Sequence, residues 1–141
     1  MLMIAAGKKQ EHAFIFSTHD RTNVEEIKDA LKFDKRAKAA MIYLKEEPCI
    51  LHVACRTIEN AGKLVNIARQ SGWKKSGIIS TRQGKVMTEL ISTEILAAPV
   101  SDMGKLLFED SYLRTLVSEA NKKLMQTREK IKNLEKSFKG I

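Results

Sequence analysis

A long apolar stripe at the C-terminal end constrains the fold of this chain more than any other feature of the sequence. From about Asp110 onward, apolar side chains recur at steps of three and four residues, the spacing of one face of an α-helix. They are Leu113, Leu116, Val117, Ala120, Leu124, Ile131, Leu134 and Phe138. The stripe predicts one helix of about 25 residues or more. A helix of this length needs other elements to cover its apolar face, so we expect strands and helices upstream to pack against it.

The character of this helix changes beyond Leu124. The later residues are strongly basic, with Arg128, Lys130, Lys132, Lys136 and Lys139 interrupted by Glu129 and Glu135. Two interpretations stay open: a solvated extension that pairs with a second copy of the chain, and an arm that contacts RNA. We therefore expect a core at about 9–124 and a basic amphipathic helical extension at 125–141.

Short apolar runs upstream predict strands, and two helical patterns lie between them. We expect strands at 12–18, 39–44, 49–55, 76–81, 85–92, 95–100 and 105–108, and helices at 22–35 and 58–71. Residues 49–55 (CILHVAC) are nearly all apolar and predict a buried strand. The short Arg82-Gln83-Gly84 connection predicts a hairpin. The order of elements predicts an α/β (α+β) fold, with a single mixed β-sheet flanked by helices, in one domain that spans 1–141.

Composition narrows the class of protein. The net charge of +8 favours either contact with phosphates or merely a soluble surface. No apolar run approaches the roughly 20 residues of a membrane span, so we expect a cytoplasmic protein without a membrane partner. Lysine and isoleucine usage would suit an archaeal thermophile. Cys49 and Cys55 lack the spacing of a metal or redox motif, so we expect packed, reduced thiols and no metal site.

Polar residues follow two of the expected strands, where α/β sheets usually build sites. His19 and Asp20 follow the first strand and are either a base with its orienting carboxylate or turn residues. His52 lies within the apolar strand, either as a hydrogen-bonded core histidine or as a base. Arg56 ends that strand before a helix, where a guanidinium can bind a carboxylate or phosphate in bidentate fashion.

Two further stretches combine basic, aromatic and acidic side chains. Trp73 precedes Lys74 and Lys75, and its ring either fills the core or stacks on a base. Ser76 and Gly77 come next, and a glycine lets backbone approach a ligand closely. Glu89 lies in an apolar strand and needs a cationic partner: Arg56, Arg82 or a ligand. Lys85 adds a second cation beside the expected hairpin.

These stretches resemble the wybutosine-pathway tRNA methyltransferase family, the third enzyme of that pathway. The similar segments are FIFSTHD at 14–20, PCILHVACRTIENAGKL at 48–64, ARQSGWKKSGIIS at 68–80 and VMTELIST at 86–93. The sequence has no GxGxxG motif and no P-loop, which argues against ordinary dinucleotide or nucleoside-triphosphate binding. The resemblance extends from about Lys9 to the final helix.

The resemblance implies a function. Members of this family use S-adenosylmethionine to methylate a ring nitrogen of the modified guanosine beside the anticodon of tRNA(Phe) that carries a wybutosine precursor. On chemical type we assign His19, Asp20 and His52 to proton transfer, and Arg56, Ser76, Gly77 and Glu89 to the cofactor. The RNA would contact Trp73, Lys74, Lys75, Arg82 and Lys85.

One departure from the family pattern keeps alternatives open. Relatives carry a Ser-Ser-Cys-Ser-Gly-Arg segment upstream of the first matching strand, and this sequence does not contain it. The chain is then an N-terminally shortened methyltransferase, with a homodimer or a second polypeptide as candidates to complete the site. The alternative is a non-catalytic tRNA-binding or accessory relative.

Overall fold

The computed structural model describes residues 2–6, 14–82 and 84–139, and these residues group into two compact units. Unit 1 contains the described residues of 1–47 and 95–125, and unit 2 contains those of 48–94 and 126–141. The long C-terminal helix α3 (Asp110–Lys139) supplies residues to both units. The expected single domain with a core at 9–124 stays a prediction.

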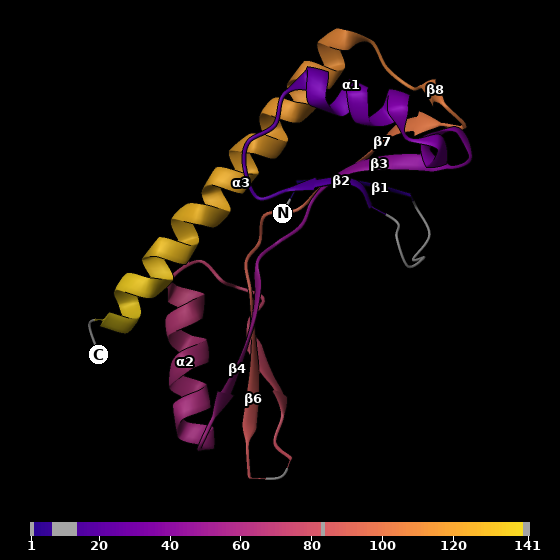
Figure 1. Cartoon of the computed structure of the whole chain (residues 1–141). Coiled ribbons are helices and arrows are strands. Elements are labelled where there is room, and N and C mark those ends of the chain that lie inside the picture. Colours follow the sequence, from indigo (N-terminus) through magenta and orange to yellow (C-terminus); the bar gives the residue numbers. More distant parts are fainter. Residues whose placement is uncertain (1, 7–13, 83, 140–141) are drawn as a thin grey trace. The chain divides into compact units, whose positions relative to one another are not determined.

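Unit 1 is a five-stranded antiparallel sheet with helices packed on it. Its sheet has the strand order β2-β1-β3-β7-β8. The strands are β1 (Leu2–Ala6), β2 (Phe14–Thr18), β3 (Met41–Glu46), β7 (Leu96–Asp102) and β8 (Lys105–Leu106). The helices are α1 (Val24–Phe33), the short 3-10 helix η1 (Lys35–Lys38) and the first part of α3. Figure 1 shows α1 and this part of α3 on the same side of the sheet.

The core of unit 1 forms where these helices meet alternate residues of the strands. Ile42 and Leu44 of β3 are fully buried, because side chains two apart on a strand point to the same face. They pack with helix residues that recur at helical spacing, including Ile27 and Leu113. The Asn23 side chain caps α1 by accepting a hydrogen bond from the backbone N–H of Glu26 at 2.9 Å.

Unit 2 is a three-stranded antiparallel sheet with α2 against one face. Its strands are β4 (Ile50–Cys55), β5 (Gly77–Ser80) and β6 (Val86–Ile91), in the order β4-β6-β5. Helix α2 (Ile58–Gln70) begins directly after β4 and lies beside the sheet in Figure 1. The Thr57 hydroxyl caps α2 by accepting a hydrogen bond from the backbone N–H of Asn60 at 3.2 Å.

The core of unit 2 is small and has a tryptophan at its centre. Trp73 packs with Ala68 of α2, Leu90 of β6 and Leu134 of α3. Gly72 has φ of +93°, in the left-handed region that favours glycine, and it ends the helix before Trp73. A Cβ at Gly72 would lie 3.0 Å from Cε of Lys130, so this position also needs a small residue for packing.

The expected α/β class and the long helix from Asp110 are confirmed, but two details of the prediction are wrong. The strands form two antiparallel sheets rather than one mixed sheet, because β4 pairs with β6 instead of joining β3. The strand at 49–55 is not buried: β4 is an edge strand, and α2 covers only one face of its sheet. The apolar pattern of the sequence did not predict strand β1. Residues 12–13 of the first expected strand, and Gln83 of the hairpin, lie outside the described residues.

Three further observations concern the described residues alone. None of their helices has the length and apolar character needed to cross a membrane. Within the same residues, no group of three His, Cys, Asp or Glu side chains is arranged to hold a metal ion. Cys49 and Cys55 are half-buried free thiols, and burial raises the pKa of the Cys49 thiol.

Candidate functional site

A row of three residues crosses the middle of the β4-β6-β5 sheet. The register places Glu89 of β6 directly between His52 of β4 and Gly77 of β5. The His52 Nε2 atom lies 2.8 Å from Oε2 of Glu89, and the two side chains are 54% and 31% exposed. The sequence predicted roles for all three residues, and the structure brings them together. The side chain that pairs with Glu89 is the His52 imidazole, rather than Arg56 or Arg82.

This row lies on the sheet face opposite α2, which we call the open face. Val53 and Leu90 pack in the core against α2, so alternation places their neighbours His52 and Glu89 on the opposite face. Apolar pairs flank the row in register on the same face: Ile50 with Ile91, and Ala54 with Met87. Gly77 widens the space, because a Cβ built there would meet no atom within 4 Å. The open face thus offers a carboxylate–imidazole pair within an aliphatic surface.

Three cations lie at one end of this sheet. Cys55 at the end of β4 pairs with Val86 at the start of β6, so Arg56 lies at the same end as the β5–β6 hairpin turn. Arg82 and Lys85 flank that turn, in which the backbone N–H of Lys85 donates to the Arg82 carbonyl at 3.2 Å. All three side chains are exposed. Such a cluster can attract a carboxylate or a phosphate.

Two residues assigned to ligands have structural roles instead. Trp73 is fully buried, and its indole N–H donates to the Lys130 carbonyl at 3.2 Å, so its ring fills the core and is not available to stack on a base. Ser76 is also buried; its hydroxyl donates to the Trp73 carbonyl at 2.7 Å and accepts from the Ile91 N–H at 3.1 Å. These bonds use the Ser76 hydroxyl within the fold, which corrects its assignment to the cofactor. For Trp73, the core alternative left open by the sequence is the one observed.

The remaining assigned residues lie elsewhere. Lys74 and Lys75 are exposed in the turn before β5, at the end of the sheet opposite to Arg82 and Lys85. His19 and Asp20 belong to unit 1, just after β2, and both are exposed. The Asp20 backbone N–H donates to the Thr18 hydroxyl at 2.9 Å, which is the local bonding of a turn. A catalytic role for His19 and Asp20 stays a prediction.

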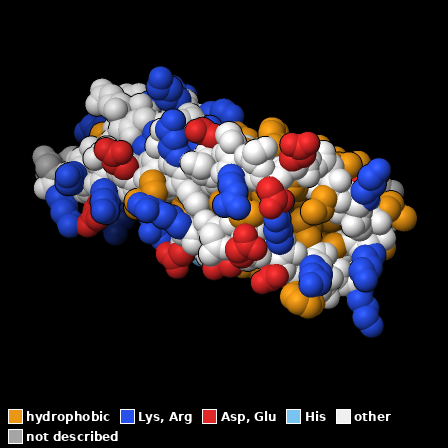
Figure 2. Space-filling model, turned by 90° about the horizontal axis from the view of Figure 1, so that it is seen from above, with side chains coloured by type: hydrophobic (Ala, Val, Ile, Leu, Met, Phe, Trp, Pro, Cys, Tyr) orange, Lys and Arg blue, Asp and Glu red, His pale blue; other side chains and the backbone are white. Residues whose placement is uncertain are grey.

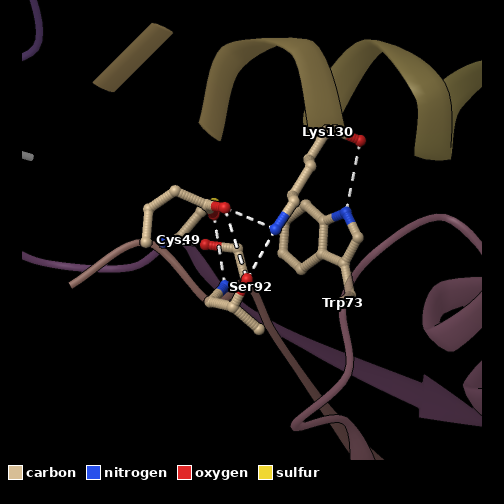
Figure 3. Close-up of polar contacts among 6 residues, drawn as sticks. Cys49, Trp73, Ser92 and Lys130 are labelled. Atoms are coloured by element: carbon tan, nitrogen blue, oxygen red, sulfur yellow. Dashed lines mark hydrogen bonds and ion pairs between the residues drawn. The ribbon is translucent and has the colours of Figure 1, made fainter. Parts of the chain in front are cut away.

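A charged cluster that joins Lys130 to the buried Glu94 was not predicted from the sequence. Lys130 of α3 forms an ion pair with Glu94, and its amine also donates to the Thr93 hydroxyl at 2.6 Å. Figure 3 shows the Lys130 side chain pointing to this group while its carbonyl accepts from Trp73. Burial alone would raise the pKa of Glu94, but the hydrogen bond and charge of Lys130, together with hydrogen bonds from the Glu94 backbone and Ser92, lower the pKa overall. The sequence shows only separate charges here, because the pairing joins residues far apart along the chain.

Solved structures share this combination of two sheets and a long helix. The chain matches the PH1069 protein of Pyrococcus horikoshii with a TM-score of 0.88 and 28% identity, covering 96% of this chain and 70% of that one. A hypothetical protein from Aeropyrum pernix matches with a TM-score of 0.81 at 22% identity, which shows the same fold. Both solved structures therefore share the fold of this chain.

The sequence assigns the chain to a family. The family model described as Methyltransferase TYW3 matches residues 3–140, and the chain belongs to that family. A relative from Archaeoglobus fulgidus, named tRNA(Phe) 7-((3-amino-3-carboxypropyl)-4-demethylwyosine(37)-N(4))-methyltransferase, is 32% identical over 96% of this chain. A relative of the same name from Thermococcus sibiricus is 33% identical over the whole chain. The tRNA wybutosine-synthesizing protein 3 homolog of Xenopus laevis is 33% identical over 88% of the chain.

These relatives are longer than the present chain. The chain spans 66% of the Archaeoglobus relative, 70% of the Thermococcus relative and 48% of the Xenopus relative. The match to the family model and the identity to these relatives confirm the resemblance to the wybutosine-pathway family that the sequence shows.

Proposed function

We propose that this chain is an S-adenosylmethionine-dependent methyltransferase of wybutosine biosynthesis. Its substrate is tRNA(Phe) carrying a wybutosine precursor, and the methylated atom is a ring nitrogen of the modified guanosine beside the anticodon. The observation that carries the proposal is membership of a methyltransferase family together with a carboxylate–imidazole pair on an open sheet face. A tRNA-modifying role suits a cytoplasmic location.

The residues of unit 2 have the chemistry that the methyl donor requires. The donor carries a carboxylate, an ammonium group and a methyl sulfonium, and when bound it supplies an electrophilic methyl group. Arg56 is exposed and has no hydrogen-bond or ion-pair partner among the described residues, so its guanidinium is available to the carboxylate. His52 engages one carboxylate oxygen of Glu89, which leaves the other oxygen for an ammonium group. The open space at Gly77 lets a ligand approach the Glu89 side chain.

His52 is the residue we assign to the proton lost from the nucleophilic ring nitrogen. A neutral His52 that donates its Nε2 proton to Glu89 presents Nδ1 as an acceptor. The Glu89 carboxylate fixes this tautomer and stabilises the imidazolium that forms when Nδ1 takes up the proton. In this proposal Glu89 has two roles: it orients His52, and it binds the ammonium group of the methyl donor. His19 and Asp20 of unit 1 are further candidates for proton transfer.

The RNA contacts follow from charge and exposure. Arg82 and Lys85 lie at the same end of the sheet as Arg56, and Lys74 and Lys75 lie at the other end. Lysine and arginine side chains are also distributed widely over the face in Figure 2, with acidic side chains among them. We assign these four residues to tRNA phosphates, where each neutralised phosphate makes binding more dependent on salt.

The test is transfer of a labelled methyl group to tRNA(Phe) that carries the precursor base. The proposal expects transfer by the purified chain and loss of transfer in Glu89→Gln. Asn66→Ala, a change at an exposed position of α2, is the matched control and should keep full activity. If the folded chain binds tRNA but neither binds S-adenosylmethionine nor transfers the methyl group, it is the non-catalytic tRNA-binding relative instead.

A further inference from the structure

A second basic site is formed within unit 1 by residues that have no role assigned above. A pocket of about 410 Å³ forms between the C-terminal half of α1 and the β7–β8 hairpin. Its lining consists of Lys28, Leu31, Lys32, Lys38, Ser101, Gly104 and Leu106. The lining therefore contains lysines but no carboxylate. Three larger pockets of the described residues differ from it: one includes Glu25, one includes Glu94 and Glu129, and one has no carboxylate but only a single lysine, Lys63.

The lysines of this pocket differ in how they are bonded. Lys28 Nζ lies 2.5 Å from Oδ2 of Asp110, so its charge is largely compensated. Lys32 and Lys38 have no carboxylate partner among the described residues. The nearby Asp34 is bonded to Arg36, whose side-chain hydrogen bonds lower the pKa of Asp34. Two lysine charges thus remain for a ligand, and the chemistry of the pocket suits a phosphate group.

An exposed aromatic ring lies beside this pocket. Phe33 is 73% exposed, the largest exposure among the large hydrophobic side chains described. The Lys32 amine lies 5.5 Å from the centre of the Phe33 ring, so the residue that lines the pocket also contacts the ring. Neighbouring Met103 and Leu106 are exposed as well. An exposed ring next to unpaired lysines is the arrangement that binds single-stranded nucleic acid, with bases on the ring and phosphates on the cations.

The backbone around the pocket is held closely. Met103 and Gly104 form the β7–β8 turn with φ of +49° and +83°, both in the left-handed region. A Cβ at Gly104 would lie 3.4 Å from Cγ of Lys38, so the turn packs closely against that side chain. The Met103 N–H also donates to the Ala40 carbonyl at 3.2 Å, which ties the turn to the segment after η1. The turn and Lys38 therefore form a defined wall of the pocket.

We infer that this site, the α1 pocket with Phe33, binds an unpaired nucleotide of RNA, with the phosphate on Lys32 and Lys38 and the base stacked on Phe33. The inference rests on the proposed function in one respect, since that function makes RNA the natural ligand. It adds a contact surface built from residues of unit 1, whereas the residues assigned to the donor and to tRNA phosphates belong to unit 2.

The test measures binding of the full chain to a labelled single-stranded RNA of about ten nucleotides, by fluorescence anisotropy over a series of salt concentrations. Phe33→Leu keeps an apolar side chain but removes the ring, and should weaken binding about tenfold. Phe33→Tyr keeps the ring and should bind like the unsubstituted chain. Lys32→Ala with Lys38→Ala should reduce the slope of log affinity against log salt by about 1.4.

The matched control removes two exposed lysines elsewhere, Lys63→Ala with Lys122→Ala, and should change the slope less. Equal effects of the two double variants, or no effect of Phe33→Leu, would overturn the inference. So would no RNA binding by the unsubstituted chain, or loss of binding to anionic lipid vesicles in the Phe33 variant with RNA affinity unchanged. Because the assay uses neither S-adenosylmethionine nor methyl transfer, a chain that fails as a methyltransferase can still pass it, and the converse also holds.

Discussion

The two faces of the β4-β6-β5 sheet both carry polar side chains, and they are bonded in different ways. On the face under α2, Thr88 is fully buried and its hydroxyl donates to the Val53 carbonyl at 3.0 Å. On the open face, His52 and Glu89 bond each other across the strands and keep further acceptor sites exposed to solvent. A buried polar group whose hydrogen bonds are all made within the fold stabilises the structure. A polar group on an accessible face that can still accept a hydrogen bond is able to bind a ligand or transfer a proton. Substitutions on the two faces should therefore separate stability from activity.

The largest expected effect is on activity, from a change on the open face. His52→Ala removes the proposed proton acceptor and should reduce the rate of methyl transfer about a thousandfold, the middle of the range for general bases. The free energy of unfolding should change by less than about 0.5 kcal/mol, because the side chain is more than half exposed. Single-turnover methyl transfer and urea unfolding measure the two quantities. A fall in stability that matches the fall in activity would contradict the comparison.

The next effect is on stability, from the ion pair between Lys130 and the buried Glu94. Lys130→Met leaves Glu94 buried without its cation and should lower the free energy of unfolding by roughly 3 kcal/mol. The double variant Lys130→Met with Glu94→Gln should recover part of this loss, since no charge is then buried alone. Urea denaturation of the two variants gives the comparison. An additive loss in the double variant would show that the two side chains do not depend on each other.

A smaller effect on stability is expected at Thr88, on the sheet face under α2. Thr88→Val keeps the shape of the side chain but removes the hydrogen bond to Val53, at a cost of about 1 kcal/mol. Glu89→Gln, one residue along the same strand but on the open face, should change the free energy of unfolding much less. Thermal unfolding of these two variants compares the contributions of the two sheet faces to stability within one strand. A larger loss from Glu89→Gln would show that the open face also stabilises the fold.

The smallest effect is a dependence of stability on pH. The pKa of Glu94 is lowered below its ordinary value of 4.5, so its ionised form stabilises the folded state above that pH. This stabilisation should be lost as the pH falls below about 4.5 and through the lowered pKa of the folded state. The free energy of unfolding, measured between acidic and neutral pH, should change less with pH for Glu94→Gln than for the unsubstituted chain. Parallel profiles would contradict the role of this carboxylate.

Local patterns predicted much of the fold. The helix from Asp110 and the hairpin between residues 77–80 and 86–91 follow from apolar spacing and a short turn with Gly84, which depend on neighbours in sequence. Partition into two sheets depends instead on which strands pair, and β4 pairs with β6 across about 35 residues. The apolar composition of 49–55 therefore predicted a buried strand, whereas β4 lies at a sheet edge and only the face under α2 is covered.

The candidate site was predicted only in part, because residue types can be read from the sequence but strand pairing and burial cannot. Residue type identified His52, Gly77 and Glu89, and the register then places them in one row. The same reasoning assigned Trp73 and Ser76 to ligands, although the fold uses both within its core, because exposure cannot be inferred from residue type. Lys130 was placed in a basic extension, and its ion pair with Glu94 depends on tertiary packing alone.

Calorimetric titration with S-adenosylmethionine tests the central claim, that the open face of unit 2 binds the methyl donor. The unsubstituted chain should bind saturably, Arg56→Ala should weaken binding about tenfold or more through loss of a charged hydrogen bond, and Arg82→Ala should leave the affinity unchanged. Both arginines are exposed at the same end of the sheet, so the pair separates a specific contact from general charge. Absence of binding by the folded chain, or equal losses in the two variants, would contradict the account.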